Sequence, residues 1–176
     1  MKLTVCVIGL NVADKIGKLI ASLGGIADEF VYLDNGSGDG SLAVVQKLRP
    51  DAITDTYVDP NRHPQYGWTS DFSELRNKSF AMCSGDAILW LDADDVLVNA
   101  VGMRALIQRA MFDIPDPCHV LNCRYDYSFD QYGNCTVRQT RYRVVRRGFV
   151  EWEYPVHEDI KPIRPTKLGE CARADT

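Results

Sequence analysis

The sequence predicts an α/β domain with a mostly parallel sheet flanked by helices and an antiparallel β segment toward its C-terminus. First, strand-like and helix-like patterns alternate three times before residue 92. Second, the apolar run 88–91 suits a strand that is buried on both faces, as in parallel sheets. Third, the alternation gives way after residue 111 to two strand-like runs around a turn.

The first half of the chain reads as strand–helix units. Expected strands cover residues 3–10, 29–33, 52–58 (the weakest of them) and 87–91. Expected helices open at Asn11, at Asp39 and at Asp71. Apolar residues recur at helical spacing after each of these polar starts, and Gly24-Gly25 and Pro50 end the first two helices.

The second half begins with one more helix, which contains Met103 and Met111. Residues 119–129 and 135–145 then predict two antiparallel strands around the turn 130–134. A polar tail with little pattern follows residue 160.

Composition bounds the class of protein. A chain of 176 residues with 45% hydrophobic and 25% charged residues fits one globular domain. A net charge of −4 and a pI near 5.3 argue against a nucleic-acid coat protein or a binder of anionic membranes. No apolar run is long enough to span a membrane. The six cysteines are scattered, so we expect reduced thiols and a cytoplasmic protein.

The run 88–91 ends on three carboxylates within four residues: Asp92, Asp94 and Asp95. The carboxyl ends of strands are where open α/β sheets bind ligands. Three like charges there repel one another unless a cation lies among them, and carboxylates can hold Mg²⁺ or Mn²⁺ while leaving positions for phosphate oxygens. The alternative is a solvated strand-to-helix turn in which Asp95 caps the helix.

Asp34 ends the second strand and is expected at the same edge as Asp92. A carboxylate beside a glycine-rich loop can accept a hydrogen bond from a base imide N–H or a ribose hydroxyl. The alternative for Asp34-Asn35-Gly36 is a tight turn without a ligand. The first strand brings a third loop, with Asn11, to this edge.

Two further segments carry candidate chemistry. Arg76 lies at the edge of the buried stripe of its helix, where it can reach a phosphate or lie idle on the surface. His157-Glu158-Asp159 combines an imidazole with two carboxylates, and its alternative is a solvated turn.

In order along the chain, these motifs resemble the family 2 glycosyltransferases of GT-A fold. The resemblance covers residues 3 to about 160. The motifs that carry it are Asn11, Leu33-Asp34-Asn35-Gly36-Ser37, Asp71-Phe72-Ser73 with Arg76-Asn77, Gly85-Asp86, Leu91-Asp92-Ala93-Asp94-Asp95 and Val156-His157-Glu158.

The resemblance implies a metal-dependent, inverting transfer of a sugar from a nucleotide-sugar, favouring a UDP-sugar. Asp34 would read the base, with Asn11 and Gly36 in the same nucleotide site, and Arg76 would steady the nucleotide. Asp92 would contact ribose or metal, Asp94 would ligate Mn²⁺ or Mg²⁺, and His157 would approach the metal or diphosphate. Glu158 or Asp159 would be the base.

The resemblance also implies one GT-A domain, with a nucleotide-binding half (1–97), an acceptor-side half (98–160) and a tail (161–176). Two departures from the family are visible. Leu10-Asn11-Val12-Ala13 stands where many relatives have Lys-Asn-Glu-Glu, and the chain stops soon after His157-Glu158. A homodimer partner could complete the acceptor side, and the acceptor is open among saccharide, lipid-linked, protein or modified DNA.

Other interpretations stay open at this point. The domain could bind a nucleotide-sugar without transferring it. Residues 91–97 also fit the strand-end motif of haloacid-dehalogenase-type phosphatases, although that motif normally opens its chain. The arginines between 138 and 147 could grip an anionic acceptor or form an exposed face of two strands.

Overall fold

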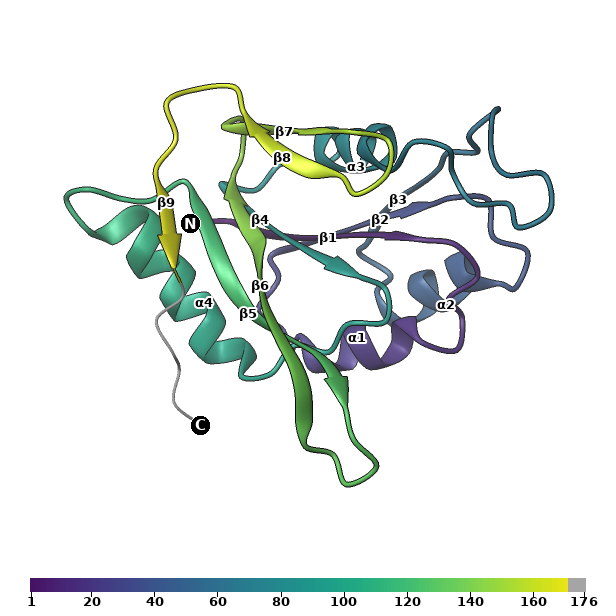
Figure 1. The fold of residues 1–176 in the computed structure, drawn as a ribbon, viewed down its shortest axis with the longest axis horizontal. Helices are drawn as coiled ribbons and strands as arrows, with labels where there is room; N and C mark the ends of the chain where they lie inside the picture. Colours follow the sequence, from purple (N-terminus) through teal and green to yellow (C-terminus); the bar gives the residue numbers. More distant parts are fainter. Residues whose placement is uncertain (171–176) are drawn as a thin grey trace.

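The computed structural model describes residues 1–170 and contains two sheets (Figure 1). The larger sheet has seven strands in the order β3-β2-β1-β4-β6-β5-β9, and the smaller pairs β7 with β8. The strands are β1 Leu3–Gly9, β2 Glu29–Asp34, β3 Ile53–Thr56, β4 Ala87–Asp92, β5 Val120–Phe129, β6 Cys135–Arg146, β7 Val150–Glu153, β8 Asp159–Pro162 and β9 Leu168–Glu170. The helices are α1 Ile16–Ser22, α2 Ser41–Leu48, α3 Phe72–Ala81 and α4 Ala100–Gln108, and a π-helical turn, η1 Arg109–Asp113, continues α4.

The N-terminal half forms a parallel sheet, as the alternating pattern predicted. β1 lies between β2 and β4, and β2 pairs with β3, all in parallel. Figure 1 shows α1, α2 and α4 below the sheet, with α3 and the β7–β8 hairpin above it. Apolar side chains of β1 and β4 pack into a separate core on each face, which explains why their runs do not alternate. The predicted fold class is confirmed.

Two helices start later than the sequence suggested. The first begins at Ile16, because Asn11 has a left-handed backbone (φ 53°) and binds the neighbouring loop. The second begins at Ser41, whose N–H is accepted by Asp39 Oδ1 at 3.0 Å. The third start is confirmed, because Asp71 caps α3 by accepting the N–H of Glu74 at 2.9 Å.

The Gly85-Asp86 motif is structural in this fold. A Cβ at Gly85 would lie 2.5 Å from Thr4 Oγ1, so only glycine fits beside the start of β1. Asp86 Oδ2 accepts the backbone N–H of Lys2 at 2.7 Å. The motif therefore fixes the amino end of β4 against β1, opposite the end that carries Asp92.

The C-terminal half adds an antiparallel ribbon. β6 pairs with β4 and with β5, and the β5–β6 hairpin extends well out of the body (Figure 1). Leu121 pairs with Val144 and Asn122 with Tyr142, so Arg143 is an extra residue in a β-bulge. Within the expected tail, β9 adds a short strand parallel to β5, and residues 171–176 lie outside the described chain.

The described residues include no helix long and apolar enough to cross a membrane. Cys6, Cys83 and Cys135 are not joined in disulfides, and Cys171 lies outside the described residues.

Candidate active site at the carboxyl edge of the sheet

The strand ends meet at one edge, as predicted. Gly9 pairs with Asp34 and Ile8 pairs with Asp92, so the carboxyl ends of β1, β2 and β4 align in register. The loops that follow these strands therefore share one rim, where the sheet presents its ligand-binding edge.

Asp34 is buried at this rim and organises the loop that follows it. Its Oδ2 accepts the N–H groups of Gly36 at 2.9 Å and Ser37 at 2.8 Å. Its Oδ1 lies 3.3 Å from the hydroxyl of Tyr32. The left-handed φ of 82° at Gly36 makes this turn possible. The tight-turn geometry is thus present, and it holds the carboxylate at the rim in one orientation.

Asn11 joins the first loop to the second. Its Oδ1 accepts the N–H of Gly38 at 2.9 Å, and its own N–H donates to Ser37 Oγ at 2.9 Å. The neighbouring Asn35 is 3% exposed, and its Oδ1 has no hydrogen-bond partner in the described structure. The two loops therefore form one rigid unit with an unused acceptor in it.

Asp92 is held by two arginines that lie far apart in sequence. Arg76 Nη2 is 2.9 Å from Asp92 Oδ1, and both terminal nitrogens of Arg143 are 3.1 Å from Oδ2. Burial opposes ionisation of Asp92, but the two guanidinium groups outweigh it and keep its pKa below the ordinary value. The indole of Trp90 lies near both guanidinium carbons, at 4.4 Å from that of Arg76 and 4.2 Å from that of Arg143.

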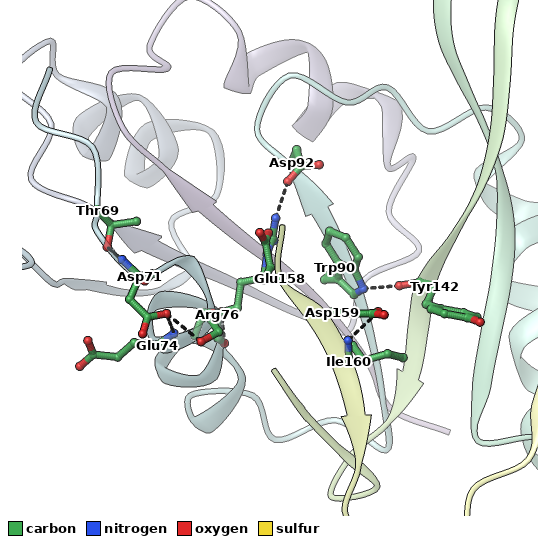
Figure 2. Close-up of polar contacts among 12 residues, drawn as sticks. Thr69, Asp71, Glu74, Arg76, Trp90, Asp92, Tyr142, Glu158, Asp159 and Ile160 are labelled. Carbon is green, nitrogen blue, oxygen red and sulfur yellow. Dashed lines mark hydrogen bonds and ion pairs between the residues drawn. The ribbon is translucent and has the colours of Figure 1, made fainter. Parts of the chain in front are cut away.

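Arg76 also reaches the His157-Glu158-Asp159 segment (Figure 2). Its Nε donates to Glu158 Oε1 at 2.7 Å, so one buried guanidinium bridges Asp92 and Glu158. The next residue, Asn77, grips β7: its Nδ2 donates to Trp152 O at 2.9 Å, and its Oδ1 accepts the Trp152 N–H at 2.8 Å. The Arg76-Asn77 pair thus fixes the β7–β8 hairpin over the rim.

The three carboxylates that follow β4 differ from one another. Asp95 is buried, pairs with Arg143 at 3.0 Å and accepts the Asp92 N–H at 2.9 Å. Burial raises the pKa of Asp95. Asp95 therefore braces the turn, and it does not cap the next helix, because the N-cap of α4 is Asn99. Asp94 is exposed and forms no hydrogen bond or ion pair within residues 1–170.

Asp92 and Asp94 are suited to binding a metal ion together with a bound ligand. Among the described residues, no three His, Cys, Asp or Glu side chains gather closely enough to hold a metal by themselves, so Asp92, Asp94 and His157 do not form such a cluster. Mg²⁺ is commonly bound by one or two carboxylates together with substrate phosphates. The free carboxylate of Asp94 beside Asp92 has the chemistry for that arrangement.

The loop between β7 and β8 carries backbone strain. Tyr154 (φ 70°) and His157 (φ 58°) both have left-handed backbones, which non-glycine residues seldom adopt outside constrained sites. Pro155 O accepts the N–H of Phe72 at 2.9 Å and so ties this loop to the start of α3. His157 and Asp159 are exposed, whereas Glu158 is partly buried against Arg76.

A cavity of about 330 Å³ opens beside this loop. Its wall includes the whole triplet His157, Glu158 and Asp159, together with residues of β4, β5, β6 and β7. The structure thus brings Arg76, Asp92 and Glu158 into direct contact, with Asp159 and His157 on the adjoining cavity. Asp34, Gly36 and Asn11 form a separate cluster on the same edge of the sheet.

Sequence reasoning missed Arg143 and the indoles of Trp90 and Trp152. Arg143 appeared to be one of several arginines between 138 and 147 that could form an exposed face, and Arg138 does behave that way, because it pairs with Asp126 at the surface. Arg143 is instead 5% exposed, because the bulge turns it toward Asp92. A bulge in a strand pairing leaves no local signal in one sequence.

Several solved structures share the fold of this chain. Residues 1–349 of TarS from S. aureus in complex with UDP match with a TM-score of 0.62 at 16% identity, over 98% of this chain and 61% of that one. Glucosyl-3-phosphoglycerate synthase from Mycobacterium tuberculosis matches with a TM-score of 0.54 at 19% identity, over 72% of this chain and 45% of that one. These matches establish the GT-A fold.

The sequence itself establishes the family. Residues 4–101 match the family model described as glycosyl transferase family 2, so the chain belongs to that family. A TPR repeat-containing protein from Synechococcus elongatus is 32% identical over 97 residues, which are 55% of this chain and 21% of that protein. The chain thus spans about a fifth of that relative, and it spans 48% of another TarS crystal structure. The match includes Asp34, Arg76 and Asp92, which leaves no basis for the phosphatase interpretation.

Proposed function

We propose that this domain transfers a sugar from a UDP-sugar to an acceptor hydroxyl, with inversion at the anomeric carbon and with help from Mn²⁺ or Mg²⁺. The observation that supports it best is the double contact of Arg76. One guanidinium joins the strand-end carboxylate of Asp92 to Glu158, which lies 82 residues after Arg76 in the chain. The donor edge of the sheet and the candidate base segment therefore form one site.

The donor side is the rim of β1 and β2. We assign base recognition to Asp34 and the loop that Asn11 and Gly36 shape around it. The fold neighbours support uridine, because structures of TarS contain UDP-GlcNAc or UDP and a structure of the synthase contains UDP. Arg76 supplies positive charge for the diphosphate.

We assign the metal to Asp94, with Asp92 beside it and His157 approaching from the β7–β8 loop. A divalent ion there would neutralise the charge that grows on the departing diphosphate. A structure of the synthase contains Mn²⁺ together with UDP, which supports this type of ion. Asp92 already has both oxygens on arginines, so Asp94 is the direct ligand that the protein offers without rearrangement.

Of the two candidate bases, the contacts favour Asp159. Glu158 is ion-paired with Arg76, which holds its carboxylate in place. Asp159 is exposed on the cavity and forms no ion pair within the described residues. In the proposed step, Asp159 takes the acceptor proton as the acceptor oxygen attacks the anomeric carbon. The bond from that carbon to the diphosphate breaks, its electron pair leaves with UDP, and the anomeric centre inverts.

The test is a thermal-shift and calorimetric titration with UDP, with and without Mn²⁺, followed by turnover assays over a panel of UDP-sugars. We expect Mn²⁺ to tighten UDP binding to the wild type. Asp94→Ala should remove that dependence without lowering the melting temperature of the free protein, because Asp94 is exposed and unpaired.

Asp51→Ala is the control, since Asp51 is an exposed aspartate that precedes β3 at the opposite end of the strands. Its ion pair with Arg49 lies at the surface, where such pairs contribute about 0–1 kcal/mol. If the metal-dependent shift survives in Asp94→Ala, the metal assignment is wrong. Saturable UDP–Mn²⁺ binding with no hydrolysis or transfer from any UDP-sugar would instead identify a non-catalytic binding domain.

A further inference from the structure

The β5–β6 hairpin forms an arm, residues 123–142, that extends beyond the rest of the molecule (Figure 1). Within the described residues, β4 pairs with β6 only at residues 144–146, and β9 pairs with β5 only at residues 120–122. No described strand therefore covers either long edge of the arm. A two-stranded hairpin without further strands is only marginally stable in water, so a partner strand on one edge would stabilise the arm.

Exposed aromatic rings gather on this arm. Tyr127, Phe129 and Tyr132 are 61%, 57% and 80% exposed. The ring centroid of Tyr127 lies 6.0 Å from that of Tyr125, so the rings continue along β5 toward the base of the arm. Tyrosine and phenylalanine are enriched in protein–protein interfaces, because a rigid ring buries a large area at a low cost in conformational entropy. The arm therefore has the surface composition of an interface.

The two strands of the arm differ in charge. β6 contains four arginines and no acid: Arg138, Arg141, Arg143 and Arg146. Two copies of the β6 edge would therefore bring like charges together. β5 instead contains one base and one acid, Arg124 and Asp126, which lie two residues apart and so on the same face of the strand. In an antiparallel pair of β5 strands with the two-fold axis at Tyr125, each Arg124 lies opposite the partner's Asp126.

This register also fits the open length of the β5 edge. A pair centred on Tyr125 uses residues 123–127, and the next position toward the base, Asn122, already pairs with β9. At the other end, the β5–β6 pairing shifts between Asp126 and Ser128, and such a bulge bends the strand. The two Tyr125 rings then meet at the axis. The open length, the charges and the rings all favour a second copy of this chain as the partner strand.

We propose that two copies of this chain pair edge to edge through residues 123–127 of β5, antiparallel about a two-fold axis at Tyr125, with each Arg124 opposite the partner's Asp126. Backbone hydrogen bonds along the open edge supply affinity, and the two charge pairs fix the register. The base of the same arm brings Arg143 to Asp92, so the dimer holds the ribbon that completes the candidate active site. The inference does not rest on the proposed sugar transfer.

Sedimentation velocity of the purified chain over a concentration series tests the association. We expect the wild type to pass from monomer to dimer as the concentration rises. Arg124→Asp leaves two acids on the strand and Asp126→Arg leaves two bases, so each variant places like charges opposite each other in its own dimer. The dimer Kd of each variant should rise more than about tenfold, because like charges facing each other across an interface strongly disfavour it.

An equal mixture of Arg124→Asp and Asp126→Arg tests the register. In the mixed pair, both acids of one chain lie opposite both bases of the other, so we expect a one-to-one heterodimer although neither variant associates well alone. Such a rescue also shows that both variants are folded. Asp51→Arg is the matched control, because Asp51 is exposed and also pairs with an arginine two residues away, Arg49, outside the arm. Its dimer Kd should equal that of the wild type.

Four results would overturn the proposal. The first is a wild type that stays monomeric up to about 1 mM. The second is a dimer that persists in both single variants, since its contact would then lie elsewhere. The third is a mixture that does not associate, which would exclude the two-fold register at Tyr125. The fourth is a monomer whose amides 123–127 are protected from hydrogen exchange, since another part of the chain would then cover this edge. UDP–Mn²⁺ binding is measured separately, so the proposed function stands or falls independently.

Discussion

The two ends of the parallel sheet use carboxylates in opposite ways. At the amino end, Glu29 is 7% exposed, and both of its carboxylate oxygens accept hydrogen bonds from other residues of the protein. Its Oε1 accepts from Thr4 Oγ1 at 2.8 Å and from Ser84 N at 2.7 Å, and its Oε2 lies 2.6 Å from Lys2 Nζ. The hydrogen bonds outweigh the burial that opposes ionisation and lower the pKa of Glu29 to about 2.

At the carboxyl end the protein leaves acids unused. Asp92 and Asp95 are paired with arginines, but Asp94 and Asp159 form no ion pair within residues 1–170. Two nearby residues, Tyr154 and His157, have strained backbones, and the buried indole N–H of Trp152 has no hydrogen-bond partner in the described structure. A satisfied buried acid stabilises the fold, whereas an exposed acid without an ion-pair partner is available to a ligand.

The largest effect should come from Asp159, an acid without an ion-pair partner, whose Oδ1 accepts the N–H of the neighbouring Ile160 at 2.8 Å. Asp159→Asn removes the proposed proton acceptor, so we expect turnover to fall about 10²- to 10⁴-fold. The melting temperature and the Kd for UDP–Mn²⁺ should stay at wild-type values, because Asp159 forms no ion pair that the fold would lose. Steady-state kinetics and calorimetry measure the two quantities.

Glu158→Gln is the informative companion to that variant. It removes the charge that faces Arg76 at 2.7 Å, so donor affinity and stability should change along with turnover. If Asp159→Asn keeps full turnover while Glu158→Gln loses it, the base is Glu158 and the assignment is reversed.

The next effect should appear in stability. Arg143→Met removes the guanidinium that pairs with both Asp92 and Asp95. Breaking a buried ion pair typically lowers the free energy of unfolding by about 3–5 kcal/mol. Urea denaturation should show this loss in the free energy of unfolding. Arg138→Met is the control, since its pair with Asp126 is exposed and such pairs contribute about 0–1 kcal/mol. Equal losses in the two variants would mean that the Arg143 network is not a structural unit.

These expectations also show what one sequence could reveal. The rim of Asp34 and Asp92 was predictable, because strand ends of a parallel sheet converge wherever the chain alternates strand and helix. The start of α3 was predictable from Asp71, since a cap acts on its own neighbours. Local chemistry determines both features.

The remaining features depend on contacts between distant residues. Arg143 enters the site only because a bulge shifts the β5–β6 register, and Asn77 matters because β7 lies within reach of its amide. Periodicity could not distinguish Arg143 from Arg138, which sits five residues earlier on the same strand and stays at the surface. β9 was missed because a short strand after a proline-containing segment has too few residues to show a pattern.

The smallest effect should come from a substitution at the amino end of the parallel sheet, and it should leave UDP–Mn²⁺ binding unchanged. Glu29→Gln replaces a buried charged acceptor, so we expect a loss of about 1.5–3 kcal/mol in the free energy of unfolding at neutral pH. Because the pKa of Glu29 is lowered from its ordinary 4.5 to about 2, its contribution is complete above pH 4.5 and disappears as the pH falls toward 2. Stability curves of wild type and Glu29→Gln should therefore converge over that window, while the Kd for UDP–Mn²⁺ at pH 7 is the same for both. A parallel pair of curves, or weaker UDP binding in the variant, would show that the two ends of the sheet do not divide stability and ligand binding between them.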